Sequence, residues 1–316
     1  MARLMLCSRH TEHVFTIRNE MMKKTLLALS LIGLTGSAVA SPFYVDGNTN
    51  WNGDLAASTD KVCDTCTSSK NEITYIYQSN STTIDSNGSG ALDAGDTIIT
   101  DGGVAVGNLT NNVVTGFNPS EVFGVANDNG YGDNWLLTFG FTGLTGTVVE
   151  YTPGVSLELA YGPGGSFDLY YTEDGTTLYN FMDIQVTGAV TGSGGTLLAG
   201  VVDFADADVL TDGDPTNDWM LNLFHSDGAT CGGQSGYYDI WSTCDGTGLP
   251  LLQITFLADF NTNASTINVT DNGAAGAILT GNHDGSAVFN VPEPSTLALF
   301  GGTLLLLGAS ARRRKA

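Results

Sequence analysis

Oxygen-bearing side chains recur at a regular spacing in one short segment, residues 85–96, which reads DSNGSGALDAGD. Carboxylate, amide or hydroxyl groups stand at its first, third, fifth, ninth and twelfth positions, with a glycine at the sixth. Calcium takes about six to eight oxygen ligands around one point, and this spacing supplies them from a single loop. The ligands that the spacing predicts are the side chains of Asp85, Asn87, Ser89, Asp93 and Asp96 and the backbone carbonyl of Ala91.

This segment resembles the loop of an EF-hand, in which Gly90 would allow the sharp turn and Leu92 would pack inward. It departs from that pattern at Ser89, where an acid or amide is usual, and at Asp96, which replaces a longer bidentate glutamate. Residues 97–100 read as a strand and not as the exiting helix, so the resemblance covers the loop alone. We therefore expect Ca²⁺ as a cofactor, and the alternative is an ordinary Asx- and glycine-rich turn.

Other candidate sites are weaker. The acidic clusters at residues 127–133 and 206–214 lack a complete loop pattern and match the usual composition of turns. No metalloprotease, serine-hydrolase or phosphate-loop motif occurs, and His225 near Asp227 is typical of a structural histidine. Carboxylate pairs for glycoside hydrolysis carry little information in so acidic a chain. We expect no catalytic residues and no enzyme, with a secreted hydrolase as an alternative.

The end of the chain, residues 291–316, has three parts in order: VPEPST, an apolar run over 297–309, and a basic tail. The prolines disfavour helix at the start and leave that segment open to a protease. The apolar run is close to the lower length limit of a membrane span, about 17 residues, and basic residues behind it favour the cytoplasmic side. A buried core helix is the alternative. The basic tail consists of Arg312, Arg313, Arg314 and Lys315.

With Pro292, Glu293 and Pro294 as its motif, this tail resembles the PEP-CTERM sorting signal of Gram-negative bacteria. The resemblance implies an exosortase as a partner, cleavage near the motif, and a membrane intermediate held by the C-terminal segment. It also implies export to the cell surface or the extracellular space. The acidic, β-rich body is loosely similar to members associated with flocculation and exopolysaccharide, so extracellular polysaccharide is a further candidate partner.

The start of the chain reads as an upstream extension, residues 1–20, followed by a signal peptide. Two lysines precede a short apolar stretch, and the small-residue sequence Ala38-Val39-Ala40 predicts cleavage by signal peptidase between Ala40 and Ser41. The chain therefore divides into three regions: residues 1–40, a secreted domain over 41–290, and the sorting signal over 291–316.

Within 41–290 there are 30 acidic residues and two lysines, a net charge near −28. This excludes nucleic acid as a partner and repels anionic polysaccharide unless divalent cations bridge the two.

Four cysteines remain after export, and an even number in an oxidising compartment favours disulfides. Three pairings are open, and proximity in the sequence favours Cys63 with Cys66 and Cys231 with Cys244. A four-thiolate zinc site is an alternative, since the first pair has the spacing of a zinc knuckle.

The secreted region is expected to be all-β, an antiparallel β-sandwich or jelly roll. An Asp-Gly pair at Asp174 and Gly175 predicts a hairpin between residues 167–172 and 177–181. The candidate strands are 72–78, 97–100, 112–117, 135–141, 146–151, 155–161, 166–172, 178–186, 196–204, 219–224, 237–242, 251–258 and 286–290.

Three aromatic residues, Tyr237, Tyr238 and Trp241, lie between the last two cysteines. Their alternation favours a strand that buries one face, and a platform that stacks on sugars is the alternative. Together these features predict an exported, structural or adhesive surface or matrix protein of floc or biofilm. A carbohydrate-binding, lectin-like module is the second hypothesis.

Overall fold

A computed structural model of the chain describes residues 40–49, 62–119, 121–122, 129–192, 195–228, 230–244, 253–260, 267–271 and 276–291. All of them belong to one compact unit that begins at Ala40. The predicted signal peptide, the Pro292–Glu293–Pro294 motif, the apolar run and the basic tail lie outside the described residues.

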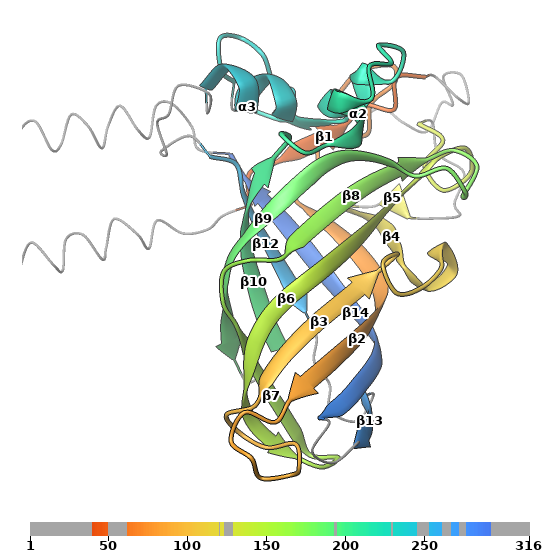
Figure 1. Ribbon diagram of the computed structural model, residues 1–316. Coiled ribbons are helices and arrows are strands. Elements are labelled where there is room, and N and C mark those ends of the chain that lie inside the picture. The colour runs from red at the N-terminus through yellow and green to blue at the C-terminus, as the bar shows by residue number, and fades with distance from the viewer. Residues whose placement is uncertain are drawn as a thin grey trace, which may run out of the picture. The chain divides into compact units, whose positions relative to one another are not determined.

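Among the described residues, twelve strands form one antiparallel sheet (Figure 1). Alternating apolar and polar residues explain why these segments are strands. In ITYIY, near the start of β2, Ile73, Tyr75 and Tyr77 are buried while the residues between them are half-exposed. The strands are β2 (Glu72–Ile84), β3 (Thr97–Gly103), β4 (Val113–Asn118), β5 (Glu121–Val122), β6 (Leu136–Thr152), β7 (Ser156–Tyr161), β8 (Ser166–Thr172), β9 (Tyr179–Gly192), β10 (Gly195–Asp203), β12 (Thr255–Phe260), β13 (Ile267–Asp271) and β14 (Ala277–Asn290).

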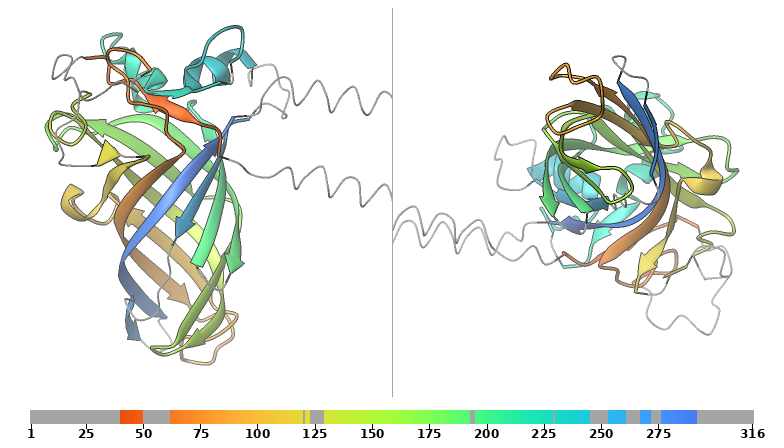
Figure 2. Two further views of the ribbon diagram at one scale, coloured as in Figure 1. Left: turned by 180° about the vertical axis from the view of Figure 1, so that it is seen from behind. Right: turned by 90° about the horizontal axis from the view of Figure 1, so that it is seen from below.

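The sheet closes on itself because β14 pairs with β12 on one side and with β2 on the other. Eight strands thus form a ring, which Figure 2 shows from one end: β2, β3, β6, β8, β9, β10, β12 and β14. They follow one another round the ring in chain order. The connections are therefore those of a meander and lack the crossovers of a jelly roll.

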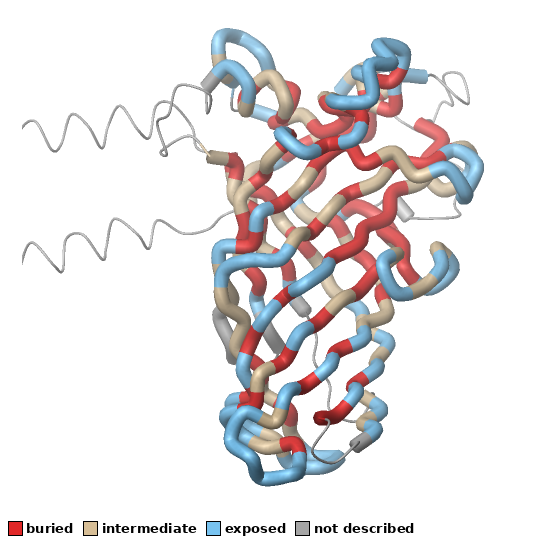
Figure 3. The backbone as a smooth tube through the Cα atoms, viewed as in Figure 1, coloured by how far each residue is buried: buried red, intermediate tan, exposed pale blue. Residues whose placement is uncertain are grey.

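Side chains from strands that are not hydrogen-bonded to each other pack inside the ring in an aromatic core. The rings of Phe167 on β8 and Phe256 on β12 lie 5.2 Å apart, and those of Tyr75 on β2 and Phe139 on β6 lie 4.9 Å apart. Figure 3 shows the resulting alternation of buried and exposed residues along the strands. Gly102 on β3 is required here, because a Cβ at that position would overlap the ring of Phe141. The predicted all-β, antiparallel, sandwich-like fold is confirmed.

One end of the ring is covered by short elements, of which β1 (Phe43–Val45) pairs with β11 (Phe224–Ser226) (Figure 1). The rings of Phe43 and Phe224 both pack on Phe289 of β14, at 5.8 and 5.3 Å. These contacts tie the cover to the core of the sheet. The helices described are α2 (Asp208–Thr211), α3 (Tyr237–Cys244) and two 3-10 turns, Leu109–Asn111 and Asp218–Asn222.

Most of the candidate strands are present, and the predicted 135–141 and 146–151 strands are the two halves of β6. The predicted hairpin is the β8–β9 connection, in which Gly175 has a φ of 69° and Asp174 accepts the amides of Thr176 and Thr177. These local features follow from the turn chemistry of the sequence.

Two predicted strands are wrong. Residues 237–242 lie in α3, where Tyr237 and Ile240 are buried, a three-residue spacing that suits a helix. The side chain of Asn222 accepts the amide of Asp239 in the first turn of α3, so a contact from another element supports the helix start. Most of residues 219–224 lie in the 3-10 turn Asp218–Asn222, and β11 begins only at Phe224.

Candidate functional site

The predicted calcium loop, residues 85–96, connects β2 to β3. It is anchored to the neighbouring strand β6, because Val148 donates to the Asp96 carbonyl at 2.9 Å and accepts from the Gly95 amide at 2.8 Å. Leu92 is buried as predicted, in a small apolar cluster that includes Ile98 and Val148. The loop is therefore held in one place by the strands beneath it.

Asp85 occupies the first ligand position and is half-exposed. Its Oδ2 accepts the amide of Gly90 at 2.8 Å, and its Oδ1 accepts those of Gly88 and Ser89 at 2.7 and 3.1 Å. The hydrogen bond from Gly90 is the largest cause that lowers the pKa of Asp85, followed by those from its neighbours. The carboxylate is thus kept ionised, as a calcium ligand must be.

Asp96, at the closing position, is 1% exposed. Its Oδ1 accepts the amide of Ser86 at 3.2 Å and its Oδ2 accepts the amide of Asp93 at 3.1 Å. The closing residue therefore joins the two ends of the loop by hydrogen bonds that need no metal.

The remaining predicted ligands pair with one another. The side-chain amide of Asn87 donates to Asp93, and the Ser89 hydroxyl donates to the Ala91 carbonyl at 2.9 Å. The carboxylates of Asp85, Asp93 and Asp96 do not all lie within 4.8 Å of one another. The loop thus has the turns of a cation site with its oxygens partly engaged in hydrogen bonds, and calcium binding stays a prediction.

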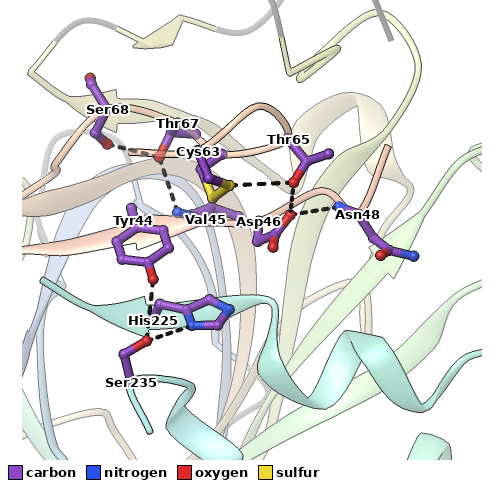
Figure 4. The surroundings of a disulfide bond; sticks show 11 residues. Tyr44, Val45, Asp46, Asn48, Cys63, Thr65, Thr67, Ser68, His225 and Ser235 are labelled. Carbon is purple, nitrogen blue, oxygen red and sulfur yellow. Dashed lines mark hydrogen bonds between the residues drawn. A yellow bond between two sulfur atoms is a disulfide. The ribbon is translucent and has the colours of Figure 1, made fainter. Parts of the chain in front are cut away.

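Cys63 and Cys66 form a disulfide, which confirms the first predicted pair (Figure 4). Asp46 is close to both sulfurs, but its Oδ1 accepts the Thr65 hydroxyl at 2.5 Å and the Asn48 amide at 2.9 Å. A zinc site would need these two sulfurs as thiolates, so the disulfide excludes that alternative for the oxidised protein.

Cys231 is also disulfide-bonded, and the side chain of Cys244 lies outside the described residues. Non-reducing peptide mapping of the secreted protein is expected to recover one peptide that links Cys231 to Cys244. Closing this short loop is expected to stabilise the fold by about 2–4 kcal/mol. Free thiols at both positions would contradict the pairing.

His225 is half-buried on β11, and its Nδ1 lies 3.1 Å from the hydroxyl of Ser235 (Figure 4). Tyr44 shares that hydroxyl, at 3.2 Å, and its ring stacks on the histidine with centroids 4.8 Å apart. Burial lowers the pKa of His225, while Asp46 and Asp239 act in the opposite direction. The sequence did not indicate Ser235, which lies ten residues away on another segment.

Asp227, the acidic residue near His225 in the sequence, donates its backbone amide to the Pro42 carbonyl. The other histidine of residues 41–290, His283, stacks on Tyr77, and its Nε2 lies 2.8 Å from the hydroxyl of Ser79. Both histidines are thus packed against tyrosine rings, as structural histidines commonly are.

The aromatic residues between the last two cysteines are packed against other rings. Tyr237 is fully buried, and Tyr238 and Trp241 lie 5.5 and 5.6 Å from the ring of Phe204. This arrangement agrees with the favoured packing role, although on a helix instead of a strand. The turn-type acidic cluster behaves as expected too, because Asp212 and Asp214 accept local amide and hydroxyl donors within residues 212–217.

The two ends of the secreted domain lie side by side. The amide of Ser41 donates to the Phe289 carbonyl at 2.9 Å, and the amide of Val291 donates to the Ser41 hydroxyl at 3.0 Å. Ser41 is the predicted first residue after signal-peptide cleavage, and Val291 begins the predicted sorting segment. Both proposed processing points therefore border the same end of the closed sheet.

Comparison with known proteins identifies a PEP-CTERM protein-sorting motif at residues 290–315. No curated protein and no solved structure matches the chain. Within the described residues, no helix is both long enough and apolar enough to cross a membrane. The motif implies processing by an exosortase, a membrane-associated sorting enzyme, through a membrane-anchored intermediate. The chain therefore carries a PEP-CTERM sorting signal and is an exported, surface-associated protein.

Proposed function

We propose that this protein is a structural or adhesive component of the cell surface or extracellular matrix, associated with exopolysaccharide in flocs or biofilm, and not an enzyme. The observation that carries the proposal is that one chain has both an export signal and a domain whose charged side chains are almost all acidic. No lysine or arginine occurs between residues 71 and 311, and Lys70 is 1% exposed. Such a surface requires cations before it associates with anionic polymers.

The second part of the proposal is that residues 85–96 bind calcium. The loop would then hold a cation at a defined place on the acidic surface. The register of β2 with β14 puts Ala287 beside Ile73 and Ile278 beside Thr82. The loop after Ile84 and the processed end after Asn290 therefore lie at opposite ends of β2, a separation of about 40 Å for a thirteen-residue strand. If the protein is attached to the cell surface near Val291, the loop would remain free to contact the extracellular matrix.

A direct test measures retention of the purified secreted protein on alginate beads, an anionic polysaccharide. We expect retention in millimolar calcium and release by EDTA, because only a divalent cation offsets the repulsion of two polyanions. Asp85→Asn should reduce retention, whereas Asp174→Asn removes a turn carboxylate outside the loop and should not. Equal elution of the wild type with calcium and with EDTA would contradict the proposal.

Processing gives a separate prediction. The mature protein is expected to begin near Ser41 and to end close to Pro292–Pro294, since the two processing enzymes act on the flanking signals. Intact-mass analysis of the extracellular protein measures both ends at once. An extracellular species that still carries Arg312–Lys315 would show that the sorting signal is not cleaved.

Carbohydrate binding is the second candidate function, and one observation favours it. A polar groove of about 320 Å³ lies beside β2, β13 and β14, lined by the side-chain amides of Gln78, Asn80, Asn268 and Asn282. Amide groups both donate and accept hydrogen bonds, as sugar hydroxyls require. A glycan array would show binding that Asn282→Ala removes and Trp241→Ala, at a ring packed on Phe204, leaves in place.

A further inference from the structure

Three aspartates lie in a row across the outer face of the closed sheet. Asp183 on β9 stands directly opposite Asp168 on β8 and Asp203 on β10. Facing residues on neighbouring strands have Cβ atoms about 4.5–5.5 Å apart, and like charges at that distance repel. A row of three carboxylates therefore needs compensating groups.

Asp203 has its compensation within the protein. Its Oδ1 accepts the amides of Phe204 and Ala205 at 2.8 and 3.0 Å, and its Oδ2 accepts the side-chain amide of Gln185 at 2.7 Å. This carboxylate is a turn-capping group, and both of its oxygens are satisfied. It serves as the internal reference for the other two.

Asp183 is compensated at only one of its two oxygens. Asp183 Oδ1 accepts the side-chain amide of Asn180 at 2.7 Å, whereas its Oδ2 is buried and has no hydrogen-bond partner. The hydroxyl of Ser166 lies 3.3 Å from Asp168 Oδ2, and the hydroxyl of Tyr170 also hydrogen-bonds to Asp168. Burial, and the direct interaction with Asp168, raise the pKa of Asp183 to about 7, and burial raises the pKa of Asp168. The pair therefore resists carrying two negative charges.

Asn180 supplies the independent observation. It is 7% exposed, and its amide nitrogen contacts Asp183, yet its Oδ1 is buried without a hydrogen-bond partner. Two orphaned atoms thus belong to side chains in direct contact, and both are oxygen acceptors. Buried oxygens of this kind are normally satisfied by a donor, a water or a cation.

The charges around the pair favour a cation at the two orphaned oxygens. Asp206, just before α2, and Asp208, in its first turn, add negative potential at the pair. No lysine or arginine occurs in this part of the chain, and Lys70 donates to Ser68 and to the Pro119 carbonyl. A negative potential without a positive side chain attracts a counter-ion.

We propose that Asp168, Asp183 and Asn180 form a second cation site, on the outer face of β8 and β9, that binds Ca²⁺. All three side chains would ligate the metal through hard oxygen atoms, and no histidine or thiolate lies among them. This ligand set favours calcium over zinc or copper. The cation would bind the two orphaned oxygens and one oxygen of Asp168, with water in the other positions. This site is separate from residues 85–96 and does not depend on the function proposed for that loop.

The test is calcium titration calorimetry of the full secreted protein at pH 8, in an Asp85→Asn background that removes the loop site. We expect one calcium-binding event to remain and to weaken more than tenfold when Asp183→Asn is added. Asp203→Asn is the matched control, because it removes the same charge from the same row at a satisfied carboxylate. It should change the affinity less than threefold.

Melts in EDTA make the result independent of misfolding. Without calcium, Asp183→Asn should melt at or above the temperature of the wild type, because it relieves repulsion from Asp168. Absence of calcium binding in the Asp85→Asn protein would show that the pair holds a proton only, and would overturn the proposal. Equal weakening by Asp183→Asn and Asp203→Asn would overturn it as well, since a general field effect would then explain the binding. If Asp183→Asn alone, with Asp85 in place, binds no calcium at all, the result would contradict calcium binding by residues 85–96.

Discussion

Replacing Phe289 by alanine is expected to lower the free energy of unfolding by about 3–5 kcal/mol. Phe289 is fully buried on β14, and its ring meets those of Phe43, Phe224 and Phe256 at 5.8, 5.3 and 5.4 Å. These partners come from the cover and from the neighbouring strand β12, on which Phe256 is paired with Phe289. A cavity here would remove contacts on all sides, and the surrounding closed sheet has little freedom to collapse into it.

Urea denaturation followed by tryptophan fluorescence measures this loss. Val149→Ala is the control, because Val149 lies on the same sheet and is 47% exposed. Its expected effect is within about 0.5 kcal/mol. If the two variants lose similar amounts of stability, Phe289 does not hold the cover to the core.

Calcium at about a hundredfold its dissociation constant is expected to raise the free energy of unfolding by about 2.7 kcal/mol through the loop at residues 85–96. Asp85→Asn should remove most of this rise, since the first ligand loses its charge. The variant keeps one side-chain oxygen to accept from the loop amides, so its melt in EDTA should stay close to that of the wild type. Thermal melts with calcium and with EDTA measure both effects, in an Asp183→Asn background in which the second proposed site does not contribute.

Asp96 is the less suitable residue for this test. It is buried and accepts the amides of Ser86 and Asp93, so Asp96→Ala should destabilise the EDTA-treated protein as well. Asp174→Asn is the matched control, because Asp174 accepts turn amides in the β8–β9 hairpin and is exposed. Superimposed wild-type curves with calcium and with EDTA would show that the loop is an ordinary turn.

The sequence alone determined those features that depend on neighbours in the chain. The sorting signal could be identified because its motif, apolar run and basic tail are contiguous, and comparison places it at residues 290–315. The β8–β9 hairpin followed from the Asp174–Gly175 turn, and β2 from its alternation. The Cys63–Cys66 disulfide followed from proximity. In each case the physical cause acts over a few residues.

Other features were decided by tertiary structure, because their causes lie far apart in the sequence. Closure of the sheet depends on the pairing of β14 with β2, which lies about two hundred residues earlier in the chain, as the pairing of Leu279 with Ser81 shows. Alternation at Tyr237 suggested a strand, yet Asn222 from another segment supports a helix there. The pairing of Asp168 with Asp183 depends on strand register, which turn geometry and core packing set together. No linear pattern marks such a pair, since only the folded sheet brings the two carboxylates and Asn180 to one place.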